Sequence, residues 1–172
     1  MWQKSDIKYI KEHIKDKKHI IITGAIGSGK STLLNELRNQ FEFGDCIPGL
    51  ITWNDQGKAV YMRKFGEDEF VAIGECNPYG LSAEKRMQPV PNGFNVYGVS
   101  LLDMLIDDDS EWIMIDEIGF LESDCQPYLK KLFELFDKKR VMAVVRKQEI
   151  KHIHEIVHRK DAMVIDLDNL HL

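Results

Sequence analysis

Residues 24–31 read Gly-Ala-Ile-Gly-Ser-Gly-Lys-Ser and match the phosphate-binding loop pattern G-x-x-x-x-G-K-[ST] at every fixed position. The pattern carries this meaning when a strand precedes it and a helix follows it. Residues 19–23 are mostly β-branched, which is typical of a buried strand, and residues 31–41 place their leucines on one helical face. The sequence therefore predicts a strand, a phosphate-binding loop and a helix, in that order.

The chemistry of such a loop assigns a role to each of its residues. Its glycines can adopt left-handed conformations that turn backbone N–H groups toward phosphate oxygens, and the helix adds its positive N-terminal end. Lys30 is expected to reach the β- and γ-phosphates, the Ser31 hydroxyl to bind Mg2+, and Thr32 to lie behind the α-phosphate. The residues expected to bind the triphosphate are Gly24, Ala25, Ile26, Gly27, Ser28, Gly29, Lys30, Ser31 and Thr32.

The chain has 172 residues, of which 44% are hydrophobic, so residues 1–172 are predicted to form a single domain around one core. A formal net charge of −5 makes nucleic acid and anionic membranes poor partners. Cys46, Cys76 and Cys125 are far apart, which disfavours a disulfide framework and a zinc site. No apolar stretch has the length of a membrane span or the form of a signal peptide, so we expect a cytoplasmic protein.

The hydrophobic patterns predict an α/β protein with three layers and a mainly parallel central sheet. Residues 1–18 contain an amphipathic helix at 5–17. Strand-like runs at 49–53, 59–65 and 69–74 are joined by turns so short that they require antiparallel neighbours, so a meander extends the sheet. The remaining strands alternate with helices and should pair in parallel through right-handed crossovers. These strands are expected to begin at His19, Trp112, Arg140 and Ala162, with helices at 124–138 and 149–158.

Residues 75–95 contain three prolines and the basic pair Lys85-Arg86, without the periodicity of a helix or a strand. A loop of this length is often functional. We interpret it either as a lid or second-substrate surface near the nucleotide, or as a segment that only wraps the surface. A short strand at 95–97 and a helix at 100–106 are expected to follow it.

A second group of chemically active residues ends the apolar run 112–115, where Asp116 and Glu117 stand side by side. The carboxyl ends of parallel strands face the ligand crevice, so both acids are expected to lie at the nucleotide. Asp116 should hold Mg2+, directly or through water. Glu117, as the next residue of the strand, should project to the opposite face, and it is expected to orient and deprotonate an attacking water as the general base.

Arg146 follows the strand 140–145, at the edge where ligands bind in such sheets. A cation there could neutralise the γ-phosphate in the transition state, which makes Arg146 a catalytic candidate. Arg86 and Arg159 are weaker candidates.

Three histidines, His152, His154 and His158, follow one another closely. The first two cannot share a helical face, and no carboxylate or cysteine completes a ligand set beside them, so we interpret all three as solvated.

Several stretches resemble the cancer-related nucleoside-triphosphatase family of small P-loop NTPases. They are the loop 24–32, Gly-Leu-Ile-Thr at 49–52, the meander, and Ile-Asp-Glu-Ile-Gly at 115–119 followed by Leu-Glu at 121–122. The resemblance implies slow, Mg2+-dependent hydrolysis of ATP, GTP and other nucleoside triphosphates with little base selectivity. It also implies an added central strand, Glu117 as the catalytic glutamate, and a fold similar to that of nucleotide kinases. Phe120 departs from the family, which often has a lysine there.

Two other functions remain open. A kinase for a nucleoside or small metabolite would use the same loop, with 75–95 as its acceptor site. A nucleotide-dependent switch or assembly ATPase would use binding, with hydrolysis as a timer. The absence of an N-K-x-D motif disfavours a translational-type GTPase. No residue pattern indicates the base preference, a protein partner or the oligomeric state.

Overall fold

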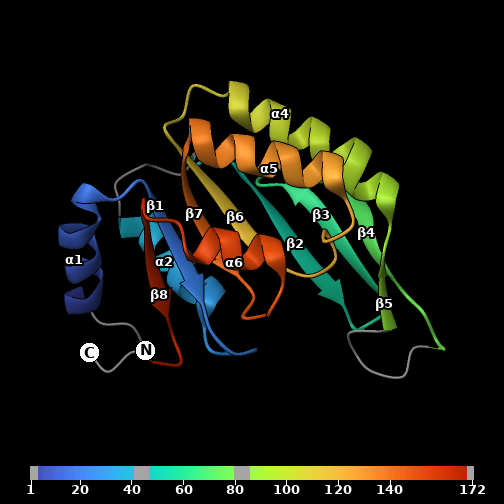
Figure 1. The fold of residues 1–172 in the computed structure, drawn as a ribbon, viewed down its shortest axis with the longest axis horizontal. Coiled ribbons are helices and arrows are strands. Elements are labelled where there is room, and N and C mark those ends of the chain that lie inside the picture. Colours follow the sequence, from blue (N-terminus) through green and yellow to red (C-terminus); the bar gives the residue numbers. More distant parts are fainter. Residues whose placement is uncertain (1–3, 41–46, 80–85, 170–172) are drawn as a thin grey trace.

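A computed structural model describes residues 4–40, 47–79 and 86–169, and Figure 1 shows their arrangement. Within these residues, eight strands form one sheet in the order β5-β4-β3-β2-β6-β7-β1-β8. The strands are β1 (His19–Thr23), β2 (Gly49–Asp55), β3 (Ala59–Lys64), β4 (Phe70–Cys76), β5 (Met87–Pro89), β6 (Trp112–Ile118), β7 (Arg140–Val145) and β8 (Ala162–Asp166).

The sheet has a parallel part and an antiparallel part, as the sequence predicted. Strands β2, β6, β7, β1 and β8 pair in parallel, and β2, β3, β4 and β5 form the antiparallel extension. The strand β7 lies between β1 and β6, so the strand that precedes the phosphate loop is not a neighbour of the strand that ends with Asp116, Glu117 and Ile118. All parallel strands end at one edge, which brings both segments to the same side of the molecule.

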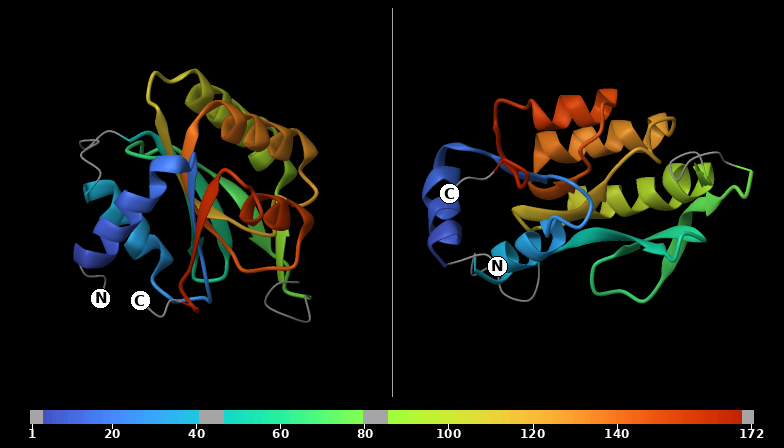
Figure 2. Two further views of the ribbon diagram at one scale, coloured as in Figure 1. Left: turned by 60° about the vertical axis from the view of Figure 1, so that its left-hand side comes forward. Right: turned by 90° about the horizontal axis from the view of Figure 1, so that it is seen from below.

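Helices cover the two faces of the sheet and complete three layers (Figure 2). On one face lie α4 (Val99–Asp107), α5 (Gln126–Lys138) and α6 (Lys151–Val157), which share a buried cluster. On the other face lie α1 (Lys4–His13) and α2 (Lys30–Gln40), whose buried side chains share a second cluster with β1, β6 and β7. No helix in the described ranges is both long and apolar enough to cross a membrane.

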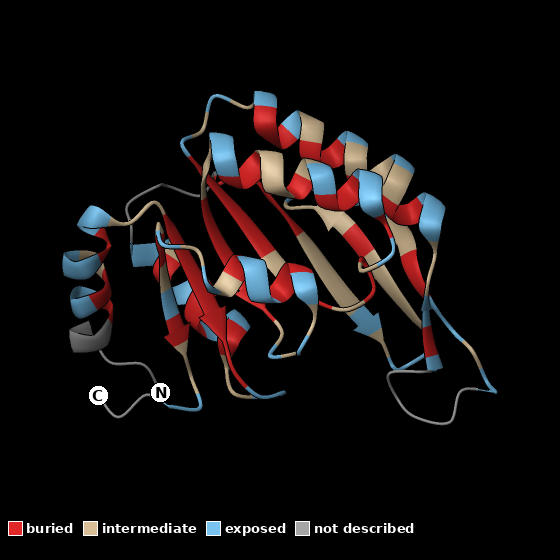
Figure 3. Cartoon of the chain, in the orientation of Figure 1, coloured by how far each residue is buried: buried red, intermediate tan, exposed pale blue. Residues whose placement is uncertain are grey.

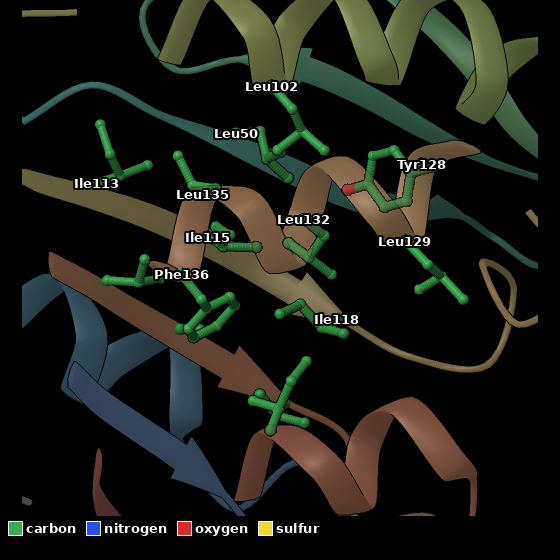
Figure 4. Packing of buried hydrophobic residues seen from close by; sticks show 14 of the residues in the cluster. Leu50, Leu102, Ile113, Ile115, Ile118, Tyr128, Leu129, Leu132, Leu135 and Phe136 are labelled. Atoms are coloured by element: carbon green, nitrogen blue, oxygen red, sulfur yellow. The ribbon is translucent and has the colours of Figure 1, made fainter. Parts of the chain in front are cut away.

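The cores follow from the alternation of side chains along the strands. On β6, Ile113 and Ile115 point to the larger cluster and Met114 to the smaller one. The central strands are buried over most of their length, whereas exposed positions concentrate on the outer faces of the helices (Figure 3). Figure 4 shows how Leu132 and Phe136 of α5 pack over the sheet.

Two predictions about the proline-rich segment are wrong. Residues 75–95 are not one loop, because β4 continues to Cys76 and β5 pairs with it in antiparallel fashion. The expected strand at 95–97 is a π-helix over Gly93–Gly98. Phe94 packs edge-on against Tyr128 at 5.0 Å between ring centroids, and the chain lies so close to β4 that a Cβ at Gly93 would be 2.1 Å from the Ala72 carbonyl oxygen. Tertiary packing therefore decides this conformation.

The N-terminal helix and the helix after the proline-rich segment form where the sequence predicted them. Ile7, Ile10 and Ile14 of the N-terminal segment are buried as their spacing predicted. The helix expected at 100–106 is α4. The end of the predicted loop helix at 41, Cys46 and residues 80–85 of the proline-rich segment lie outside the described residues.

Candidate functional site

The loop between β1 and α2 has the backbone conformation that its glycines permit. Gly27 and Gly29 have φ angles of 78° and 91°, in the left-handed region that other residues rarely adopt. The helix α2 begins at Lys30, and the first N–H groups of a helix have no partner within it. Backbone donors and a positive helix end therefore meet at the carboxyl end of β1, an arrangement that suits a phosphate group.

The side chain of Lys30 is buried within this loop. Its Nζ donates hydrogen bonds to the carbonyl oxygens of Gly24 at 3.0 Å and Ala25 at 2.7 Å. A buried ammonium requires partners of this kind. Lys30 thus lies folded over the start of the loop, where phosphate oxygens could take the place of the two carbonyls.

Ser31 and Asp116 meet across the gap between α2 and β6. The Ser31 hydroxyl donates a hydrogen bond to Oδ1 of Asp116 at 3.1 Å. Burial raises the pKa of the Asp116 carboxyl above its ordinary value, and the Ser31 hydrogen bond opposes that shift. A hydroxyl and a carboxylate are hard oxygen ligands, which Mg2+ prefers, so the residues fit this ion. Among the described residues, no three His, Cys, Asp or Glu side chains gather as a metal cluster.

Glu117 is held by the neighbouring strands on both sides. Its backbone N–H donates to the Thr52 hydroxyl of β2 at 3.2 Å. Its carboxylate accepts a hydrogen bond from Nε of Arg146, the residue that follows β7. The Glu117 side chain is 23% exposed and that of Arg146 is 36% exposed, so both remain accessible from solvent. The structure thus brings together two residues that the sequence singled out separately.

The buried side chains of Glu122 and His152 hold the backbone of Gly119, just after this pair, and we call this arrangement the Gly119 clamp. The N–H of Gly119 donates to Oε1 of Glu122 at 2.9 Å, and Nε2 of His152 lies 2.8 Å from the Gly119 carbonyl oxygen. The Arg146 side chain crosses the same glycine, since a Cβ there would lie 3.2 Å from its Cδ. The hydrogen bonds of Glu122 and His152 therefore fix the backbone on which the Arg146 side chain packs.

The clamp corrects one prediction and adds one residue. His152 is buried and not solvated, because it sits on the inner face of α6 with the Gly119 carbonyl as its partner, whereas His154 and His158 are exposed. Glu122 was expected only as part of a family motif. Its position three residues after Gly119 was the available signal, because a carboxylate at that spacing can close a turn by accepting a backbone N–H.

Burial dominates the titration of both clamp side chains. It raises the pKa of Glu122 from 4.5 to about 7, although the Gly119 N–H stabilises the ionised form. It also lowers the pKa of His152, although the Gly119 carbonyl favours the protonated form. The uncharged form of each side chain is therefore favoured relative to water.

A further carboxylate, that of Asp168, touches the phosphate loop. After β8, Asp168 accepts hydrogen bonds from the N–H of Ala25, at 2.9 Å to Oδ1 and 3.1 Å to Oδ2. Lys147, which follows Arg146 at the same edge, bridges Asp166 and Asp168 at 2.8 and 3.1 Å. Asp168 is not among the residues predicted from the sequence, although a residue just past the last parallel strand must reach the ligand edge.

The two weaker arginine candidates lie elsewhere. Arg159 pairs with Asp161 and Asp137, and the Asp161 carbonyl accepts the N–H of His19 at the start of β1. Arg159 is thus at the amino ends of the parallel strands, on the side away from the loop. Arg86 is an exposed residue just before β5.

Comparisons with known proteins agree with this arrangement. A sequence model of a protein family described as NTPase matches residues 19–170. No curated protein matches the chain. Among solved structures, the crystal structure of THEP1 from the hyperthermophile Aquifex aeolicus is similar, with a TM-score of 0.69 and 20% sequence identity over 87% of this chain and 89% of that chain. At this identity the likeness shows a shared fold.

Proposed function

Since the chain belongs to the NTPase family, which matches its residues 19–170, we propose that it hydrolyses nucleoside 5′-triphosphates to diphosphate and phosphate with Mg2+. The observation that carries the proposal is the meeting of four groups at one sheet edge. They are the phosphate loop, the Ser31–Asp116 pair, Glu117 and Arg146.

The loop supplies the binding energy for the phosphates. Backbone N–H groups from Gly24 to Thr32 would surround the β-phosphate, and Lys30 would exchange its two carbonyl partners for β- and γ-phosphate oxygens. Ser31 and Asp116 are the residues that would hold Mg2+. The ion, when bound, neutralises charge on the phosphate oxygens.

Glu117 is the proposed general base. It would accept a proton from a water molecule while the water oxygen forms a bond to the γ-phosphorus and the bond between that phosphorus and the bridging oxygen breaks. Arg146 holds this carboxylate through its Nε, which leaves its two terminal nitrogens for the γ-phosphate. Arg146 is therefore proposed to orient the base and to stabilise the charge that develops during transfer.

The proposed base range is broad, covering ATP, GTP and other triphosphates. The sequence contains no N-K-x-D motif, the pattern that reads guanine in GTPases. Every proposed contact is made to a phosphate, to the attacking water or to the metal ion, and all nucleoside triphosphates share these features. None of the proposed contacts therefore distinguishes one base from another.

Phosphate release from ATP, GTP, CTP and UTP tests the proposal, with and without Mg2+ and with no added acceptor. We expect release from all four that depends on Mg2+. Lys30→Ala should abolish it, because the loop loses its only side-chain cation. Equal turnover in Lys30→Ala would refute the assigned site. Triphosphate binding without phosphate release would favour a kinase or a switch.

A further inference from the structure

The antiparallel extension has one face that continues the face of β6 on which Asp116 lies. Side chains from β2, β3 and β4 form a row across this face. Ile51 of β2 lies opposite Asp116, and Arg63 of β3 lies opposite Ile51. Phe70 of β4 lies opposite Arg63, so one cross-strand row runs outward from the proposed metal site. Residues at paired positions point to the same face of a sheet. Neighbouring strands are about 4.8 Å apart, so Arg63 lies about 10 Å from Asp116 between Cα atoms.

Three aromatic rings form a cluster on this face. The Trp53 ring lies 5.6 Å from that of Tyr61 and 5.5 Å from that of Phe70, and Tyr61 and Phe70 are 5.1 Å apart. Phe70 is 51% exposed, and the other two rings are half-buried. In the described ranges, α4, α5 and α6 belong to the opposite face, and the helices on this face pack on β1, β6 and β7. Within the described part of the chain, the rings thus form an aromatic surface that no helix covers, beside the edge at which the parallel strands end.

Arg63 adds a cation to the rings. Its guanidinium lies 5.4 Å from the centroid of the Trp53 ring. Its Nε is buried and has no hydrogen-bond partner among the described residues. The terminal N–H donors of a guanidinium that lies beside an aromatic ring are well suited to bind a phosphate group.

We propose that Trp53, Tyr61, Arg63 and Phe70 bind a second nucleotide, a nucleoside monophosphate, through its base and its phosphate. The rings offer faces for a planar base, and stacking of this kind tolerates any base. Arg63 would hold the phosphate on the side toward Asp116. Its position beside a bound triphosphate rests on the proposed function, whereas the binding itself does not.

The charge of this surface selects this ligand among alternatives. A polynucleotide needs several cations along its backbone, yet Arg63 stands near a turn whose exposed residues include Glu67, Asp68 and Glu69. A protein partner that covered the rings with apolar side chains would leave the guanidinium of Arg63 desolvated without a counter-charge. Among the described residues, Arg63 is the cation that lies over one of these rings, which matches a ligand with one base and one phosphate.

Calorimetric titration with AMP, GMP, CMP and UMP, each alone and without triphosphate, tests the proposal. We expect at least one to bind the wild type. Arg63→Ala and Trp53→Ala should each weaken that binding about 5- to 100-fold, and Trp53→Phe should recover much of it. Lys64→Ala is the matched control, since Lys64 is the next residue of β3, points to the other face and pairs with Glu67.

A Lys30→Ala arm separates this site from the phosphate loop, because it should leave monophosphate binding unchanged even if it abolishes triphosphate turnover. Circular dichroism of each variant checks that it is folded. The proposal is overturned if no monophosphate binds the folded wild type, if Lys30→Ala removes the binding, or if Arg63→Ala and Trp53→Ala leave it unchanged. Tighter binding of a ten-residue oligothymidylate than of any monophosphate would also overturn it, in favour of single-stranded nucleic acid.

Discussion

Glu122→Gln should change how stability depends on pH. The residue Glu122 is 4% exposed, and its Oε1 accepts the Gly119 N–H at 2.9 Å. Glutamine keeps a carbonyl oxygen for that N–H and fills nearly the same volume, but it cannot ionise. The variant therefore isolates the cost of ionising a buried carboxyl from the cost of losing a hydrogen bond.

The sign and size follow from the pKa of Glu122, which burial raises from 4.5 to about 7. The folded chain holds the proton up to a higher pH than the unfolded chain does. The free energy of unfolding of the wild type should therefore fall as pH rises from 4.5 to 7 and then level off. Glu122→Gln lacks this loss, so its stability relative to wild type should increase by about 2–3 kcal/mol between pH 5 and pH 8.

Urea unfolding followed by circular dichroism at pH 5, 6, 7 and 8 measures the difference. Glu155→Gln serves as the control, because Glu155 is exposed on α6 and its replacement should leave the pH dependence of stability close to that of wild type. Parallel pH profiles for wild type and Glu122→Gln would refute the claim that the Gly119 clamp contains a carboxyl that resists ionisation.

Three further substitutions test the packing and the site. Gly49→Ala should lower the free energy of unfolding by about 3 kcal/mol, because its Cβ would lie 2.1 Å from the Met114 carbonyl oxygen across the β2–β6 pair. Gly66→Ala should lower it by about 1 kcal/mol in the same urea assay, because its Cβ meets open space but its φ is 82°. Arg146→Ala should lower single-turnover hydrolysis about 100-fold or more, with triphosphate affinity nearly unchanged, and equal rates in Arg146→Ala and wild type would remove Arg146 from the mechanism.

Local signals were enough to predict the strand, glycine-rich loop and helix at 19–40, the meander, and the positions at which the parallel strands begin. The left-handed glycines, the β-branched strand before them and the short turns after α2 each constrain the backbone within a few residues. The crossover rule then fixed the parallel pairing, although these strands are far apart in the sequence. The start of β7 at Arg140 and that of β8 at Ala162 agree with the predicted positions.

The features that sequence reasoning missed depend on contacts between distant segments. The π-helix at Gly93–Gly98 forms where a glycine allows the backbone to approach β4, which no local propensity reveals. His152 is buried because α6 lies against Gly119, 33 residues earlier in the chain. Asp168 reaches Ala25 across 143 residues. The pairing of Arg146 with Glu117 likewise required the observed strand order.

Glu117→Gln tests the central claim most directly. The proposed mechanism assigns proton acceptance to this carboxylate and assigns no triphosphate contact to it, so the variant should bind Mg-ATP with wild-type affinity. Its single-turnover rate of phosphate release should fall roughly 100- to 10,000-fold, the usual cost of losing a general base. Both quantities are measured on the same preparations of wild type and Glu117→Gln. Phosphate release by the variant at a rate near that of wild type would contradict the assignment of Glu117 as the base.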